Sequence, residues 1–255
     1  MTNSKMLIAA AASLALGTAP AIASAKADPV KSILLVHGGF VDGSGWQGVY
    51  EILKKDGYDV TIVQNPTNSL ADDVAVTKRA IAAAPGKVIL VGHSYGGMVI
   101  TGVADRAADR ISELVYLDAA HPRDGESLAI VAPAQMEPTY AGVRVVDGVE
   151  LVMWPFPGMA QFFGITDPAD AAWTESKLTP HPWKCFAQPL TLRNGDAAAR
   201  LKRTNINCTA SLGSSPGEAR ARQLEGDRNF EIDTGHDLMI TEPEAVTGLL
   251  LQVAG

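Results

Sequence analysis

The sequence feature that most constrains the fold is the run KVILVGHSYGGM, residues 87–98. Its first five residues are mostly apolar, which is typical of a strand buried on both faces of a parallel sheet. Gly92-His93-Ser94-Tyr95-Gly96 follows without a gap, matches G-x-S-x-G, and leads into residues with helical spacing. A buried strand that turns this sharply into a helix begins a β-α-β unit, so the sequence predicts an α/β fold.

The rest of the chain repeats this alternation of short β-rich runs and helical segments. Such alternation predicts a mostly parallel sheet with helices on both faces. Hydrophobic residues make up 47% of the 255 residues, enough for one large core. The predicted strands are 32–36, 58–63, 87–91, 111–117, 204–209 and 229–232, and the predicted helices are 46–55, 70–84, 95–108, 169–178, 216–224 and 243–253.

Residues 1–27 have the features of a secretory signal peptide. Lys5 supplies a positive charge, residues 6–16 are apolar and rich in alanine, and alanines at 21, 23, 25 and 27 offer cleavage sites. The apolar run is shorter than the roughly 20 residues that span a bilayer, so no membrane span is expected. We expect an exported protein, periplasmic or secreted, whose mature part is one domain of residues 28–255.

Charge and cysteine content exclude some classes of protein. The 21 basic residues minus the two lysines of the signal leave 19 against 28 acidic residues, a net charge of −9. This balance, without a basic run, predicts no nucleic-acid binding. Two cysteines, Cys185 and Cys208, form either a disulfide or two buried thiols, and the sequence leaves both alternatives open.

Ser94 is the candidate nucleophile, because a serine in a strand–turn–helix context stands at the carboxyl edge of the sheet beside a helix N-terminus. His236, in TGHD after the last predicted strand, is the candidate general base. The chain order of serine, acid and histidine is the one typical of this arrangement.

Acyl transfer also needs two N–H donors for a developing oxyanion. The motif His37-Gly38-Gly39-Phe40 follows the first strand and offers one of them, from Gly39 or the neighbouring Phe40. The residue after the nucleophile, Tyr95, offers the other. His37 is interpreted as a histidine that anchors this loop.

Asp118 is the candidate acid, because it directly ends the strand ISELVYL. A carboxylate buried at a strand end is costly unless it is paired, which favours a partner such as His236. The loop after residues 204–209 has no acidic residue before Glu218, which is the alternative. Asp233 and Asp237 lie too close to His236 in sequence to reach its ring easily.

The motifs HGGF, GHSYGGM, VYLDAAHP and TGHDLMITEPE together resemble the plant-esterase and hydroxynitrile-lyase branch of the α/β-hydrolase superfamily and its bacterial esterase relatives. The resemblance covers nearly the whole mature chain. It implies the α/β-hydrolase fold, a cap inserted after the sixth strand, catalysis without cofactor or metal, and small ester substrates. In that branch the acid usually follows the seventh strand, whereas Asp118 follows the sixth.

The same resemblance excludes some reactions. Dehalogenases and epoxide hydrolases of this fold use an aspartate nucleophile, where this chain has Ser94. The hydroxynitrile lyases place a lysine directly after the catalytic histidine, where this chain has Asp237. Lyase activity is therefore not expected.

The cap, about residues 122–195, is rich in aromatic residues that suit an apolar pocket. The candidate pocket residues are Trp154, Phe162 and Trp183. We expect a serine esterase acting on small, largely apolar esters, as a monomer or homodimer. The alternatives are a lactonase, since a lactone is an internal ester, and a small-molecule-binding receptor of the same fold with little turnover.

Overall fold

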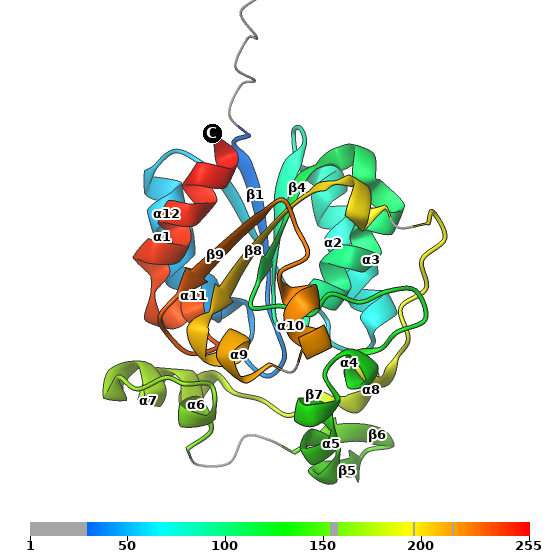
Figure 1. Ribbon diagram of the computed structural model, residues 1–255. Coiled ribbons are helices and arrows are strands. Elements are labelled where there is room, and N and C mark those ends of the chain that lie inside the picture. The colour runs from blue at the N-terminus through cyan, green and yellow to red at the C-terminus, as the bar shows by residue number, and fades with distance from the viewer. Residues whose placement is uncertain (1–29, 154–157, 196, 216) are drawn as a thin grey trace, which may run out of the picture.

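A computed structural model describes residues 30–153, 158–195, 197–215 and 217–255. Within these residues the main sheet has six strands in the order β2-β1-β3-β4-β8-β9, and every neighbouring pair is parallel (Figure 1). The predicted signal peptide lies outside the described residues. The strands are β1 Ser32–Val36, β2 Asp59–Val63, β3 Val88–His93, β4 Ile111–Leu117, β8 Lys202–Cys208 and β9 Arg228–Ile232.

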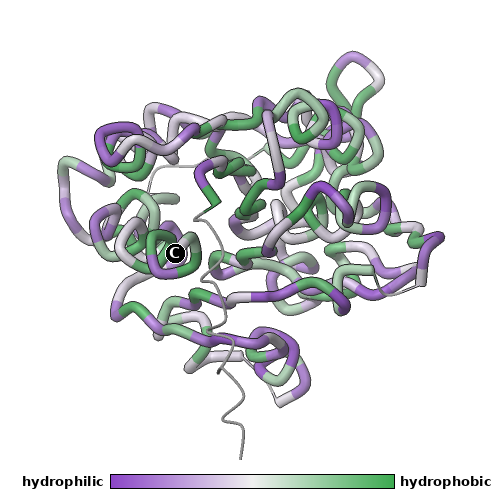
Figure 2. Tube along the Cα trace, turned by 90° about the horizontal axis from the view of Figure 1, so that it is seen from above, coloured by the Kyte–Doolittle hydropathy of each residue, from purple (hydrophilic) through white to green (hydrophobic). Residues whose placement is uncertain are grey.

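Helices cover both faces of this sheet, as the alternating sequence predicts. The helices α1 (Gln47–Lys55) and α12 (Pro243–Ala254) pack on one face, and α2 (Leu70–Ala83) and α3 (Gly96–Ala107) pack on the other (Figure 1). Strand β1 is buried along its whole length and supplies alternate residues to the two hydrophobic cores. Seen from above, many of the outer loops are hydrophilic (Figure 2).

The predicted cap forms a separate layer at the carboxyl edge of the sheet (Figure 1). It contains a small antiparallel sheet and several short helices, and the turn of its hairpin is formed by Asp147 and Gly148, both with positive φ. Its elements are α4 Leu128–Val131, α5 Pro133–Ala141, β5 Val143–Val146, β6 Val149–Val152, α6 Met159–Phe162, α7 Pro168–Lys177, β7 His181–Pro182 and α8 Trp183–Ala187.

The cap lies between β4 and β8, so the strand counted as sixth in the family is the fourth strand of the described sheet. After β8 come α9 (Thr209–Ser214) and α10 (Gly217–Gln223), and after β9 comes α11 (Leu238–Thr241). Cys185 and Cys208 are both free and buried, which decides between the two alternatives in favour of thiols. None of the helices formed by the described residues is both long and apolar enough to cross a membrane.

Candidate active site

Ser94 lies in a strained turn between β3 and α3, with a φ of +53° that side-chain-bearing residues rarely adopt. The glycines of the motif make this turn sterically possible. A Cβ on Gly92 would come within 2.6 Å of the Gly96 carbonyl oxygen, and one on Gly96 within 2.9 Å of the Val36 carbonyl oxygen. The backbone therefore holds Ser94 at the carboxyl edge of the sheet independently of its hydroxyl.

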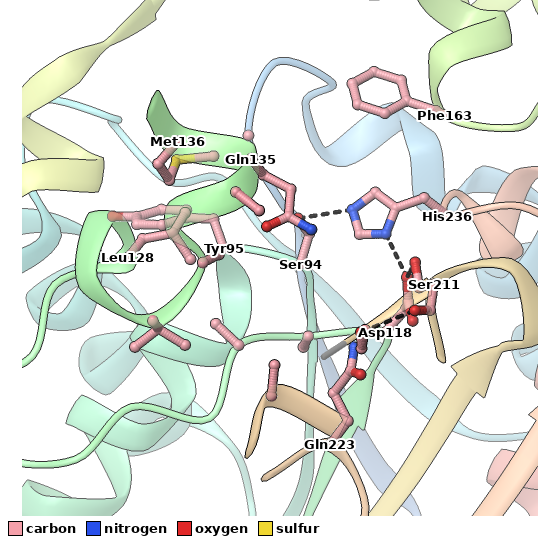
Figure 3. Close-up of a pocket in the computed structure, with 18 of the residues that line it drawn as sticks. Ser94, Tyr95, Asp118, Leu128, Gln135, Met136, Phe163, Ser211, Gln223 and His236 are labelled. Carbon is pink, nitrogen blue, oxygen red and sulfur yellow. Dashed lines mark hydrogen bonds and ion pairs between the residues drawn. The ribbon is translucent and has the colours of Figure 1, made fainter. Parts of the chain in front are cut away.

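The structure brings the three predicted triad residues together (Figure 3). The Ser94 Oγ lies 2.9 Å from Nε2 of His236, and Nδ1 of the same ring lies 2.5 Å from Oδ2 of Asp118. These residues come from the ends of three different strands, β3, β9 and β4. The arrangement is suited to passing a proton from the serine to the imidazole.

Asp118 is held by more than His236. Its Oδ2 also accepts a hydrogen bond of 2.7 Å from the Ser211 hydroxyl, and its Oδ1 accepts one of 3.3 Å from the Cys208 amide. Cys208 ends β8 and Ser211 lies in α9, so both come from the next strand of the sheet and the helix that follows it. Ser211 was not among the predicted site residues, although the hydroxyls of CTASLGSSP were the available signal.

The alternative acids point elsewhere. The Glu218 side chain is 84% exposed and binds Arg222 in the next turn of α10. Asp233 accepts a hydrogen bond from the Thr209 hydroxyl. Asp237 is buried next to His93, whose Nε2 also lies 3.0 Å from the His236 carbonyl oxygen. Of the carboxylates considered, Asp118 is the one that reaches the His236 ring.

The electrostatics of the pair suit a general base. Burial lowers the pKa of His236, but the hydrogen bond and negative charge of Asp118 outweigh burial and raise it above 6.5. Burial likewise raises the pKa of Asp118, but its bonds to His236 and Ser211 bring it below its ordinary value. Asp118 is therefore ionised when His236 takes up a proton.

Two residues that line the same cavity as Ser94 offer backbone amides as candidate oxyanion donors, Gly39 and Tyr95. Within the described part of the chain, the amides of Gly39 and Tyr95 donate to no other protein group. The Phe40 amide instead donates to His181 Nδ1 over 3.4 Å. Of the two loop candidates, Gly39 is therefore the one whose amide remains available. His37 bonds its own loop and the Asn65 amide, consistent with an anchoring role.

A cavity of about 450 Å³ has Ser94 in its wall. On the side of the cap its lining is apolar, and Phe162 belongs to this wall as predicted. The further apolar residues there, none of them among the predicted pocket residues, are Leu128, Val131, Met136, Phe163 and Phe186.

The other two predicted pocket residues, Trp154 and Trp183, are not found in the cavity wall of the described structure. Trp154 lies outside the described residues. Trp183 does not line the cavity, because its ring packs edge-on behind Phe186, with 6.1 Å between centroids, and against Tyr140. Trp183 therefore supports the wall from behind instead of forming it.

One group of side chains has the composition of a metal site. Ligand atoms of His93, His236 and Asp237 lie within 4.8 Å of one another. Both ring nitrogens of His236 are already bonded to Ser94 and Asp118, so an ion on this ring would have to displace one of those partners. The group is better suited to orienting His236 than to holding a metal.

Residues 33–249 match the sequence model of the alpha/beta hydrolase family. This match covers most of the chain. The chain belongs to the alpha/beta hydrolase family. A carbendazim-hydrolyzing esterase of Nocardioides is 34% identical over 168 residues, 61% of this chain and just under two thirds (66%) of that protein. The polyneuridine aldehyde esterase of Rauvolfia serpentina is 29% identical over 260 residues, 91% of this chain and 98% of that protein.

Solved structures agree on the fold. An extracellular alpha/beta-hydrolase from a Paenibacillus species superimposes with a TM-score of 0.75 over 89% of this chain and 99% of its own, at 24% identity. A structure of polyneuridine aldehyde esterase gives a TM-score of 0.67 over 89% of this chain and 100% of its own, at 22% identity. The predicted fold class and family are therefore confirmed.

Proposed function

We propose that this chain is a serine hydrolase that cleaves carboxylic esters of small, largely apolar substrates through an acyl-enzyme. The observation that carries the proposal is the hydrogen-bonded series Ser94–His236–Asp118 in the wall of an apolar cavity. Two related proteins named as esterases support the reaction class.

In the first half of the reaction His236 Nε2 takes the proton from Ser94 Oγ as the oxygen attacks the ester carbonyl. The new C–O bond places a negative charge on the former carbonyl oxygen, which the Gly39 and Tyr95 amides stabilise. When the tetrahedral intermediate collapses, His236 returns its proton to the departing alcohol. Asp118 remains ionised and stabilises the imidazolium throughout.

In the second half a water molecule attacks the acyl-enzyme, with His236 again as the base. The C–O bond to Ser94 breaks, the serine recovers its proton from His236, and the carboxylic acid leaves. Each proton moves through the same Nε2 atom, so one correctly oriented ring serves both halves.

The apolar wall formed by the cap supports the choice of substrate. Leu128, Met136 and Phe163 face the side of the cavity where an acyl chain or alkoxy group would lie (Figure 3). Burying such a group stabilises the bound substrate by about 25 cal/mol per Å² of apolar surface. A relative named as a pyrethroid hydrolase, from Sphingobium wenxiniae, is 32% identical over 101 residues, 35% of this chain and 36% of that protein.

The test is a panel of p-nitrophenyl esters of graded acyl length, together with lactones of similar size, on the pure protein. We expect turnover of the esters with an optimum at short to medium chains, and none in Ser94→Ala. Preferential opening of the lactones would instead identify a lactonase. Stoichiometric binding without turnover would favour the receptor and contradict the proposal.

A further inference from the structure

The cavity wall opposite the apolar cap wall is polar and comes from α9 and α10. Most of its polar side chains already have protein partners. The Ser214 hydroxyl donates to the Ala210 carbonyl oxygen, and the Ser215 hydroxyl donates to that of Ser211. The Arg222 guanidinium donates to Glu126 and Glu218, over 2.7 and 3.1 Å. None of these groups needs a ligand.

Two side chains on this side of the cavity lack such partners, Gln223 of α10 and His121 of the loop after β4. The Oε1 atom of Gln223 and the Nε2 atom of His121 are buried. Neither atom has a hydrogen-bond partner within the described part of the chain, although both residues line the cavity. A buried polar atom without a partner costs about 1–3 kcal/mol, and such atoms are rare in native proteins. Their position at the cavity indicates that a bound molecule completes their hydrogen bonds.

The charges around this wall select the kind of group. Burial lowers the pKa of His121 to about 3, helped by the charges of Arg203 and Arg222, so its ring is neutral at neutral pH. The charge of Arg222 is already matched by two glutamates. Neither a cation nor an anion would find an unmatched opposite charge here.

We propose that Gln223 and His121 form a subsite for an uncharged amide or carbamate group of the ester substrate. A secondary amide offers one N–H to the Gln223 oxygen and one carbonyl oxygen to the His121 ring, which as a neutral imidazole carries one donor. The inference rests on the proposed esterase activity. It orients the substrate, with its apolar part under the cap and its amide toward α10.

Figure 3 shows Gln223 on the opposite side of Ser94 from Gln135 and Met136 of the cap. Gln135 also lines the cavity but belongs to an exposed part of α5. Water can solvate its amide, so it has less need of a ligand. Gln135 therefore provides a matched control for Gln223.

The experiment compares two series of methyl esters in a pH-stat. One series contains N-acetyl amino esters with one to four methylene groups between amide and ester, and the other contains the fatty-acid methyl esters of equal length. We expect Gln223→Leu to lower kcat/KM for the best amide ester by roughly 10- to 100-fold, the effect of one unmade hydrogen bond to a buried group. For the fatty-acid methyl ester of equal length, the kcat/KM of Gln223→Leu should stay the same or rise.

His121→Phe, which keeps the ring stacked on Tyr116 at 4.0 Å, should show the same selectivity. Gln135→Leu should change both esters by the same factor. The inference is overturned if Gln223→Leu affects both series equally, or if Gln135→Leu alone is selective, because the cap would then recognise the amide. Hydrolysis of the fatty esters by the wild-type protein tests the esterase proposal separately, since it does not involve the amide.

Discussion

Replacing Asp118 by asparagine tests the assignment of the acid, and the structure predicts which way the new side chain will point. The Cys208 amide lies 3.3 Å from Oδ1 and can only donate, so it keeps the asparagine oxygen on its own side. The asparagine NH₂ group then faces His236 Nδ1, where a carboxylate oxygen lay before. This arrangement favours the imidazole tautomer with its proton on Nε2, which cannot accept the proton of Ser94.

The expected loss in kcat at neutral pH is roughly 10²–10⁴-fold, as for the equivalent change in other triads. Each factor of ten corresponds to about 1.4 kcal/mol of transition-state stabilisation. The assay is hydrolysis of the best p-nitrophenyl ester, with Glu218→Gln as the matched control. Because the Glu218 side chain is 84% exposed, its replacement should change the rate little.

Circular dichroism of both variants shows whether the fold is retained. An Asp118→Asn variant that folds and retains a rate near wild type would refute Asp118 as the triad acid. A crippled Glu218→Gln beside an active Asp118→Asn would place the acid on α10 instead. If neither change matters, Ser94 and His236 act as a dyad.

The remaining predictions concern the surroundings of the triad. Ser211→Ala removes a hydrogen bond of 2.7 Å from Asp118, so kcat should fall roughly 3- to 20-fold, the effect of about 1 kcal/mol or slightly more; Ser211→Thr, which keeps the hydroxyl, should restore it. The pH profile of kcat/KM should fall on the acid side with a midpoint above 6.5, because Asp118 raises the pKa of His236, and Asp118→Asn should lower that midpoint. Gly235→Ala should lower activity, because its Cβ would lie 2.5 Å from the Phe163 carbonyl oxygen, whereas Gly248→Ala, with nothing within 4 Å, should not.

Stability should also depend on pH, and the buried histidines set the sign. Burial lowers the pKa of His93, His121 and His181 to about 3 in the folded protein, from 6.5 when unfolded. The unfolded chain therefore binds more protons between these values, and the free energy of unfolding should decrease as the pH falls from 6.5 towards 3. Burial raises the pKa of Asp73 and Asp237 to about 6, which opposes the trend between pH 6 and 3.8. Urea titrations at several pH values check the net direction, and a free energy that rises steadily towards pH 3 would contradict it.

The sequence predicted the parts of the fold that local patterns determine. Strands such as β1 and β3 are continuous apolar runs, and the turn at Ser94 requires glycines at fixed positions, so both can be recognised without tertiary information. The same holds for Asp118, because a carboxylate directly after a buried strand needs a partner.

Contacts between distant segments could not be predicted in this way. Ser211 reaches Asp118 across 93 residues only because β4 and β8 are neighbours in the sheet. The placement of Trp183 behind Phe186 depends on how the short cap helices pack, and both aromatic residues fit an apolar pocket equally well by composition. Gln223 has no sequence signal at all, since a glutamine at the end of a helix is ordinarily solvated.

The measurement that tests the central claim most directly is labelling with a fluorophosphonate probe, followed by mass spectrometry of the digested protein. The probe reacts only with a serine that a neighbouring base activates. We predict one adduct per chain, on the peptide that contains Ser94, its formation abolished by Ser94→Ala and strongly slowed by His236→Ala. An adduct on another residue, or labelling that persists in a folded Ser94→Ala variant, would contradict the assignment of Ser94 as the nucleophile.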